Sequence, residues 1–267
     1  MENFFHRIFK LLPSRQEIKK SISHFSKREY FIFLVFIAIL CISTLWILQN
    51  INRSFMVETP IYGGSISEGI LGTPRFVNPV LAFSDTDQDL VALIYSGLMR
   101  KNANGELITD LASSYEVSPD GLTYTFILKD DIYFHDNKEI RSEDILFTVN
   151  KVKDPVIKSP KKGNWDGVNI EKVDEKTVRF ILRQPYASFL ENTTLGILPE
   201  DIWKDTPIEL NTANTNPIGS GPYKVSNSNK ESSGLIDHYE LSAFSKFSLG
   251  KPFLKKINLK FYANEED

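Results

Sequence analysis

The pair His135-Asp136 is the arrangement in this sequence that most invites a chemical role, because imidazole and carboxylate side chains bind metals and transfer protons. The remaining histidines are His6, His24 and His238, and no H-E-x-x-H spacing joins any of the four. His135 also ends a predicted strand, in a stretch whose pattern indicates a structural role. We therefore expect His135-Asp136 to be neither a metal site nor a catalytic pair.

The sequence also lacks the residue patterns of nucleophilic catalysis and of nucleotide hydrolysis. No G-x-S-x-G occurs, and Gly219-Ser220-Gly221-Pro222-Tyr223 lacks the Lys-Ser/Thr pair of a phosphate-binding loop. Its two glycines predict a tight turn into a strand. The single cysteine, Cys41, can form neither an intramolecular disulfide nor a cysteine metal site. The sequence therefore predicts a protein that is not an enzyme and that uses no metal or cofactor.

Charge divides the 267 residues into a basic leader and a mildly acidic remainder, although the formal net charge is only −3. Residues 1–50 carry seven Lys/Arg and three Asp/Glu, whereas residues 51–267 carry 24 and 31. Nucleic-acid binding requires a basic face, so we expect no nucleic-acid partner. The acidic excess of the larger part is consistent with simple solubility.

The stretch from Tyr30 to Leu48 contains 19 residues without a charge and is predominantly apolar. At about 1.5 Å per residue, a helix of this length crosses a hydrocarbon core of about 30 Å. Seven Lys and Arg residues precede it, whereas Arg53 is the only basic residue close behind it. By the positive-inside rule we predict a single-pass membrane protein with a cytoplasmic N-terminus and an extracellular or periplasmic C-terminal domain.

These patterns divide the N-terminal part into a basic cytoplasmic segment at 1–29, a transmembrane anchor at 30–48 and a tether at 49–63. A cleaved signal peptide is the alternative, but its apolar run usually has only about 7–15 residues and is followed by an A-x-A site, which this sequence lacks. Leu40 before Cys41 also disfavours lipidation, which requires a small residue there. We therefore predict that the anchor is retained.

Alternating apolar residues in the C-terminal part predict short strands. The pattern favours a strand at 64–70, a hairpin at 115–128 with its turn at Ser118-Pro119-Asp120-Gly121, a second hairpin around 173–178, and a last strand at 256–262.

Helical spacing of apolar residues predicts two helices among these strands. One begins at Thr86 with a capping-box-like start and continues to Leu98, and Ser142 caps the other. The polar, lysine-rich stretch 153–167 predicts an exposed loop. Interleaved strands and helices predict an α/β, or mixed α+β, fold.

A series of short motifs runs in order along the C-terminal part. They are Asn78-Pro79, residues 93–98, 110–126, 134–137, 142–145 and 184–189, and the glycine turn at 219–223. Together they resemble family 5 of the extracellular solute-binding proteins, the oligopeptide-, dipeptide- and nickel-binding group of ABC transporters. Each motif is weak by itself, but their order and spacing are specific. Asn137 and Ser220 depart from the Gly and Thr usual in the family, and neither change threatens the fold, since Asn tolerates positive φ and Ser keeps the hydroxyl.

The resemblance implies a periplasmic-binding-protein type II-like proximal lobe with an inserted domain, behind one N-terminal transmembrane helix in the bacterial cell membrane. We place the proximal lobe at 64–85 and 198–267, and the inserted α/β subdomain at 86–197. Family members are longer and continue into a distal lobe where this sequence ends. We therefore expect the N-terminal portion of such a receptor, as a fragment, a truncated gene product or one half of a split receptor.

The resemblance also implies where a ligand would bind. Phe83, Ser84 and Asp85 match a loop whose backbone approaches the ligand, and free N–H groups at a helix start can meet an anion. The alternative is that Asp85 and Thr86 only cap the helix. Trp165 matches an aromatic residue that contacts bound peptide in some relatives, and the alternative is an anchor packed on its own domain.

The function that the resemblance implies is the substrate-binding component of an ABC transporter. It would capture peptides or similar small solutes outside the membrane and deliver them to a permease. The alternative is an envelope-anchored interaction or structural protein derived from such a lobe. An exposed apolar surface where a second lobe docks would indicate a partner or further segment, and a polar one a lobe that stands alone.

Overall fold

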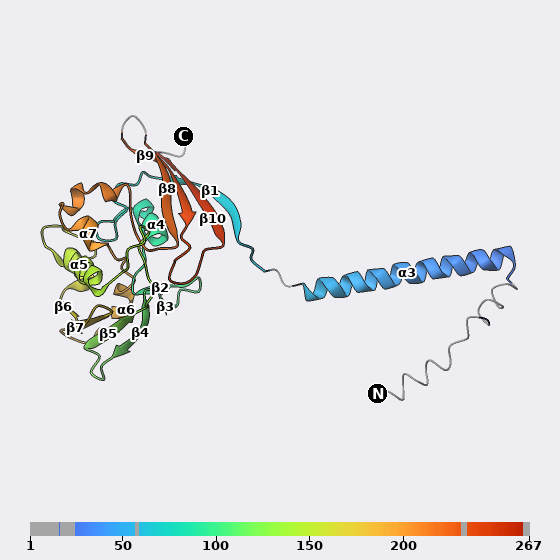
Figure 1. Ribbon diagram of the computed structural model, residues 1–267, viewed down its shortest axis with the longest axis horizontal. Helices are drawn as coiled ribbons and strands as arrows, with labels where there is room; N and C mark the ends of the chain where they lie inside the picture. Colours follow the sequence, from blue (N-terminus) through green and yellow to red (C-terminus); the bar gives the residue numbers. More distant parts are fainter. Residues whose placement is uncertain (1–15, 17–24, 57–58, 231–233, 264–267) are drawn as a thin grey trace. The chain divides into compact units, whose positions relative to one another are not determined.

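The computed structural model describes residue 16 and residues 25–56, 59–230 and 234–263 (Figure 1). The chain forms two compact units, Met1–Thr59 and Pro60–Asp267. Of the predicted basic segment at 1–29, all but residue 16 and the last five residues lies outside the described residues.

The first unit contains one long described helix, α3 (Lys27–Phe55). A capping box begins it: the Ser26 backbone N–H donates to the Glu29 carboxylate at 2.7 Å, and the Glu29 N–H donates to the Ser26 hydroxyl at 3.4 Å. Lys27–Arg53 has the length and composition of a membrane span, which a signal sequence would also have. The helix α3 extends into the first half of the predicted tether at 49–63, because extending an existing helix costs little per residue and no helix breaker occurs before Phe55. The role of 49–63 as a tether stays a prediction.

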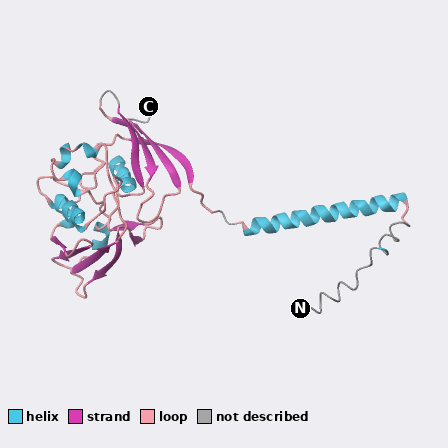
Figure 2. Ribbon diagram, in the orientation of Figure 1, coloured by secondary structure: helices cyan, strands magenta, loops and turns pink. Residues whose placement is uncertain are grey.

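The described part of the second unit contains two four-stranded sheets and a small two-stranded one (Figure 2). The first sheet has the order β1-β10-β9-β8, with β1 parallel to β10 and the other pairs antiparallel. Ile257, Leu259 and Phe261 of β10 are buried, which confirms the predicted last strand. The strands are β1 (Gly63–Leu71), β8 (Tyr223–Lys230), β9 (Ile236–Ala243) and β10 (Leu254–Tyr262).

The second sheet is antiparallel throughout, with the order β4-β5-β7-β6. It confirms both predicted hairpins, and the turn of the first is closed by the Gly121 N–H donating to the Ser118 carbonyl at 2.8 Å. The strands are β4 (Ala112–Val117), β5 (Thr123–Leu128), β6 (Val168–Lys172) and β7 (Thr177–Leu182), and the two-stranded sheet is β2 (Met99–Lys101) with β3 (Leu107–Thr109).

Two helices of the second unit differ in their bounds from the predicted ones. α4 (Asp85–Ile94) begins and ends earlier than Thr86 and Leu98, because Ser84 caps it and the chain is extended at Tyr95. Ser142 is the first residue of α5 (Ser142–Lys153) and not its cap, since its hydroxyl donates to the Asp174 carbonyl at 2.6 Å. The shorter helices are α6 (Phe189–Asn192), α7 (Glu200–Trp203) and the 3-10 turns η1 (Lys162–Trp165), η2 (Ile208–Leu210) and η3 (Thr212–Asn214).

The glycine turn joins the end of α4 to the strand β8. The Gly221 N–H donates to the Ile94 carbonyl at 2.8 Å, and the Ser96 hydroxyl donates to the Ser220 carbonyl at 3.3 Å. A Cβ atom on Gly219 would lie 2.1 Å from the Ile94 oxygen, so only glycine allows this approach. Asn137, which departs from the family's Gly, has φ 70°, a conformation that Asn tolerates.

The predicted division into a lobe at 64–85 and 198–267 and a subdomain at 86–197 stays a prediction. Apart from Gly63, the first sheet is built from the former range, and the second sheet is built from the latter. Nevertheless, Pro60–Asp267 forms one compact unit.

We expect Gly219→Ala to destabilise the second unit, because the new methyl group meets the backbone at Ile94. Overpacking of this kind typically costs about 1–3 kcal/mol. Urea unfolding followed by circular dichroism on the full chain in detergent would measure the loss. Gly163→Ala is the matched control, since Gly163 has no atom within 4 Å of its ideal Cβ position and no positive φ. Equal unfolding midpoints for the two variants would contradict the close approach.

Candidate ligand-binding site

The candidate loop Phe83–Asp85 extends from a buried base. Val80 and Ala82 are buried, whereas 80% of the Phe83 side chain is exposed. The fully buried Asn78 holds the base: its side-chain oxygen Oδ1 accepts the Val80 N–H at 2.8 Å, and its side-chain amide Nδ2 donates to the Asn214 side chain at 3.2 Å. The Ser159 hydroxyl donates to the Val80 carbonyl at 2.6 Å. Phe83 is therefore presented to solvent by a fixed segment.

The start of α4 fixes the other side of the loop. The Ser84 hydroxyl accepts the Asp87 N–H at 3.2 Å, and the Thr86 hydroxyl donates to the Leu71 carbonyl at 3.1 Å. The cap is therefore Ser84, and the predicted alternative of capping by Asp85 and Thr86 is wrong. Among the described residues, no acceptor faces the N–H groups of Asp85 and Thr86, which is the arrangement that binds an anionic or carbonyl group.

Asp87 connects α4 to the chain that precedes the loop. Its buried carboxylate accepts the backbone N–H groups of Arg75 at 2.9 Å and Phe76 at 3.1 Å. A charged acceptor strengthens such bonds. The segment before the loop and the helix after it are thereby held together.

A cavity of about 310 Å³ lies along α4 beside the loop. Gln88 belongs to its lining, and its amide donates to the Phe83 carbonyl at 2.9 Å. Arg100 also lines it and is neutralised by Asp110, with 2.7 Å between Nε and Oδ2. Lys161 lines it as well; burial lowers the pKa of its ammonium group, which has no anionic partner among the described residues. The cavity thus offers one uncompensated cation.

These lining residues were not predicted from the sequence. Lys161 belongs to the stretch 153–167, which we expected to be an exposed loop, but Ser159 and Trp165 of that stretch are buried and η1 forms within it. Only the chain fold brings Lys161 and Arg100 into the lining of one cavity, so no local spacing could have identified the pair.

Trp165 lies in the core beneath the second sheet, with 2% of its surface exposed. Its ring centre is 5.8 Å from that of Phe180 and 6.0 Å from that of Phe189. This is the position of an anchor packed on its own domain. Trp165 does not line the cavity beside Gln88, so the structure does not bring it to the loop Phe83–Asp85. A peptide contact by Trp165 stays a prediction that requires the ring to become exposed.

His135 clamps the glycine turn. Its Nδ1 accepts the Gly219 N–H at 3.3 Å, and its Nε2 lies 3.1 Å from the Gly221 carbonyl oxygen. Both bonds form together only in the neutral ring with its proton on Nε2. Burial lowers the pKa of His135 to about 4. These contacts indicate a structural role for His135. The described residues hold no group of three His, Cys, Asp or Glu side chains suited to a metal.

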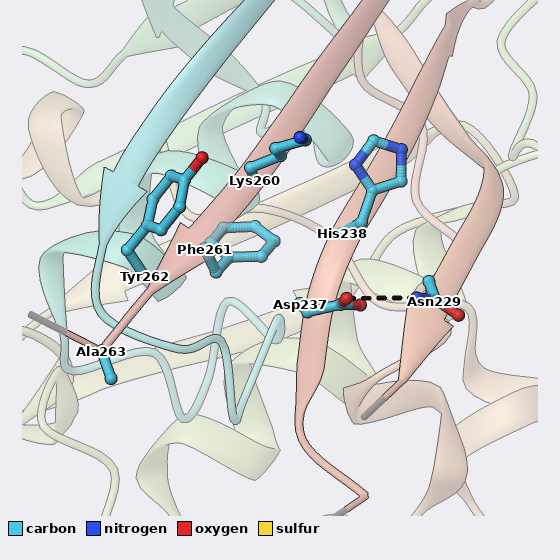
Figure 3. A pocket seen from close by; sticks show the side chains of 7 residues that line it. All are labelled: Asn229, Asp237, His238, Lys260, Phe261, Tyr262 and Ala263. Carbon is cyan, nitrogen blue, oxygen red and sulfur yellow. Dashed lines mark hydrogen bonds between the residues drawn. The ribbon is translucent and has the colours of Figure 1, made fainter. Parts of the chain in front are cut away.

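A second and larger cavity, of about 700 Å³, lies where β8 and β10 end and β9 begins (Figure 3). Asp237 accepts a hydrogen bond from the Asn229 amide at 3.1 Å, and His238 and Lys260 complete its polar lining.

Comparison with known proteins identifies the class of this domain. The model of the bacterial extracellular solute-binding proteins, family 5 (middle), matches residues 106–267, more than half of the chain. The class is therefore a solute-binding protein and not an enzyme. The chain belongs to family 5 of the bacterial extracellular solute-binding proteins.

Three relatives illustrate the similarity. The dipeptide-binding protein of Escherichia coli is 31% identical over 210 residues, which are 69% of this chain and 38% of that protein. The structure of the ABC transporter substrate-binding protein CtaP from Listeria monocytogenes matches with a TM-score of 0.68 and 33% identity over 77% of this chain and 42% of the other. The oligopeptide-binding protein AppA from Bacillus subtilis, in complex with a nonapeptide, matches with a TM-score of 0.68 and 27% identity over 76% and 41%. The chain thus spans about two fifths of the length of these relatives.

Acid should weaken the His135 clamp. Because its pKa in the folded state, about 4, lies below the unfolded value of about 6.5, the unfolded chain binds the proton first as the pH falls. The contribution of neutral His135 to the free energy of unfolding is fully present above about pH 6.5 and is lost progressively down to about pH 4. The total loss is at most about 3 kcal/mol. Urea unfolding of the full chain at a series of pH values measures this loss.

The variant His135→Asn isolates this effect, because it has no imidazole to protonate. We expect it to be less stable at neutral pH and to lose less stability on acidification. Asp144 has the opposite effect on stability. Burial raises its pKa to about 6, so its contribution to the free energy of unfolding grows as the pH falls below that value. Asp144 is present in both proteins, so it cancels in the difference. Parallel pH profiles of the variant and the native chain would contradict the clamp.

Proposed function

We propose that this chain is part of the substrate-binding component of an ABC transporter, which captures peptides or similar small solutes outside the membrane and passes them to a permease. The observation that supports the proposal most directly is that the loop Phe83–Asp85 is exposed on a buried base. The chain belongs to family 5, and the similar protein AppA was solved with a bound nonapeptide. An exposed aromatic ring and unpaired backbone N–H groups suit a ligand of variable sequence, because the ring offers contact area at a low entropic cost.

The proposed site has one face only. The loop and the cavity beside Gln88 supply contacts from the lobe that we place at 64–85 and 198–267 and from the subdomain at 86–197. In a receptor that closes around its ligand, a second lobe supplies the remaining contacts and excludes water. Affinity for a ligand that touches one face is correspondingly weak.

The exposure of the edge strand β1 indicates that a further structural element lies beside this lobe. Nearly all of its residues are exposed, and Ile66 and Leu71 are large apolar side chains among them. Its second edge pairs with no strand among the described residues. Exposed apolar edges are normally covered or blunted. This favours a second lobe or a partner chain over a lobe that stands alone, and the same surface would serve an envelope-anchored interaction protein, the alternative function.

We also propose that α3 is a retained anchor with the N-terminus in the cytoplasm. Its exposed apolar side chains form a band long enough to span a bilayer, and basic residues are concentrated before it. We expect the protein extracted from bacterial membranes to have the intact mass of the whole chain. A mass that lacks the residues up to and including α3 would show that this segment is a cleaved signal and would overturn the anchor.

Phe83→Ala should weaken peptide binding without loss of stability, since the ring is exposed. We expect about a tenfold loss in affinity, the effect of one aromatic contact worth about 1–2 kcal/mol. Short synthetic peptides of mixed sequence, at high concentration, would be titrated into the full chain in detergent and retained peptide quantified by mass spectrometry. Leu210→Ala is the matched control, because Leu210 is 76% exposed and lies outside the site. Failure of the native chain to retain peptide, or equal binding by both variants, would contradict the proposed function or the role of Phe83, respectively.

A further inference from the structure

An exposed apolar patch lies where β1 and β10 begin. Because the two strands are parallel, their first residues lie side by side, with Gly63 opposite Leu254 and the Gly63 N–H donating to the Phe253 carbonyl at 2.8 Å (Figure 1). Tyr62 stacks on Phe253 with ring centres 4.8 Å apart. We call this surface the entry patch; its exposed members are Ile61, Tyr62, Leu249, Phe253 and Leu254.

The connection between β9 and β10 holds the entry patch in place. The Phe244 N–H donates to the Pro222 carbonyl at 2.8 Å, and the Phe247 ring lies under the Arg100 guanidinium, 5.3 Å from its centre. The Ser248 hydroxyl donates to the Asp110 carboxylate, and the Lys129 ammonium donates to the Ser248 carbonyl at 3.2 Å. The aromatic rings are therefore exposed on a fixed turn.

The two segments of the entry patch, 59–64 and 244–255, contain exposed lysines and no acidic residue. The lysines are Lys246, Lys251 and Lys255. The Lys251 ammonium lies 5.8 Å from the centre of the Tyr62 ring. This local positive charge contrasts with the acidic excess of residues 51–267. Aromatic rings beside lysines are characteristic of surfaces that rest on anionic lipid headgroups.

The short connection to α3 favours the membrane as the partner of this surface. Only the seven residues 56–62 separate the end of α3 from β1, and they span at most about 25 Å even when fully extended. The entry patch includes the last two of them. A membrane that holds α3 is therefore always within reach of the patch, at a high effective concentration.

We propose that the entry patch docks on anionic lipid headgroups of the membrane in which α3 is anchored, an inference that rests on the proposed anchor. Docking would leave the candidate loop accessible. The loop adjoins the far end of β1, where Thr86 bonds Leu71, and the eight residue steps from Gly63 cover roughly 26 Å. Solute would thus reach Phe83–Asp85 from the side away from the headgroups.

The test uses the full chain with Cys41→Ser, reconstituted into vesicles of phosphatidylcholine alone or mixed with phosphatidylglycerol. Leu249→Cys carries an environment-sensitive fluorophore at the entry patch, and Leu210→Cys carries it at the matched control position. We expect a blue shift at 249 in the anionic vesicles only, reversed by high salt and abolished by reversing the charges of Lys246, Lys251 and Lys255. The label at 210 should not respond to lipid composition.

Two results overturn the inference and are distinguishable. If the chain sediments with the vesicles but the label at 249 is insensitive to anionic lipid, or responds as the label at 210 does, the domain is anchored and does not dock. If the chain fails to sediment with vesicles at all, the proposed anchor fails and the docking fails with it. Peptide retention by the detergent-solubilised chain, measured separately, shows whether ligand binding survives either result.

Discussion

The carbonyl oxygen of Ile94 at the end of α4 accepts the Gly221 N–H, and the second unit depends on this contact. The glycine turn can approach so closely only because Gly219 and Gly221 lack side chains. His135, from a third part of the chain, bonds to both glycines and stays neutral there because it is buried. One small turn thereby fixes α4 relative to β8 and to the segment that follows the hairpin β4–β5. The helix that carries the candidate loop thus has a defined position against the first sheet.

The candidate site combines a rigid base with exposed tips. Asn78 and Asp87 are buried and use their side chains to satisfy backbone N–H groups, which orders the loop together with the burial of Val80 and Ala82. Phe83 remains exposed, and the first N–H groups of α4 remain unpaired among the described residues. A surface of this kind is preorganised for a ligand, so little free energy is lost in ordering it on binding.

Charge and apolar surface are partitioned along the chain. Basic residues precede α3, and the larger unit has an acidic excess overall, whereas lysines flank exposed aromatic rings at the entry patch. That patch and the candidate loop lie at opposite ends of β1. Such a partition separates a surface suited to anionic lipid from one suited to solute, and the strand between them sets their distance.

The sequence by itself determined the features that depend on neighbouring residues. Alternation of apolar side chains located β10 and both hairpins, an uninterrupted apolar run located α3, and ordered motifs identified the family. Only the tertiary structure decided that Trp165 is buried and that Lys161 and Arg100 line one cavity. The reason is physical: periodicity records which face of an element is apolar, whereas burial and pairing depend on segments that meet only when the chain folds.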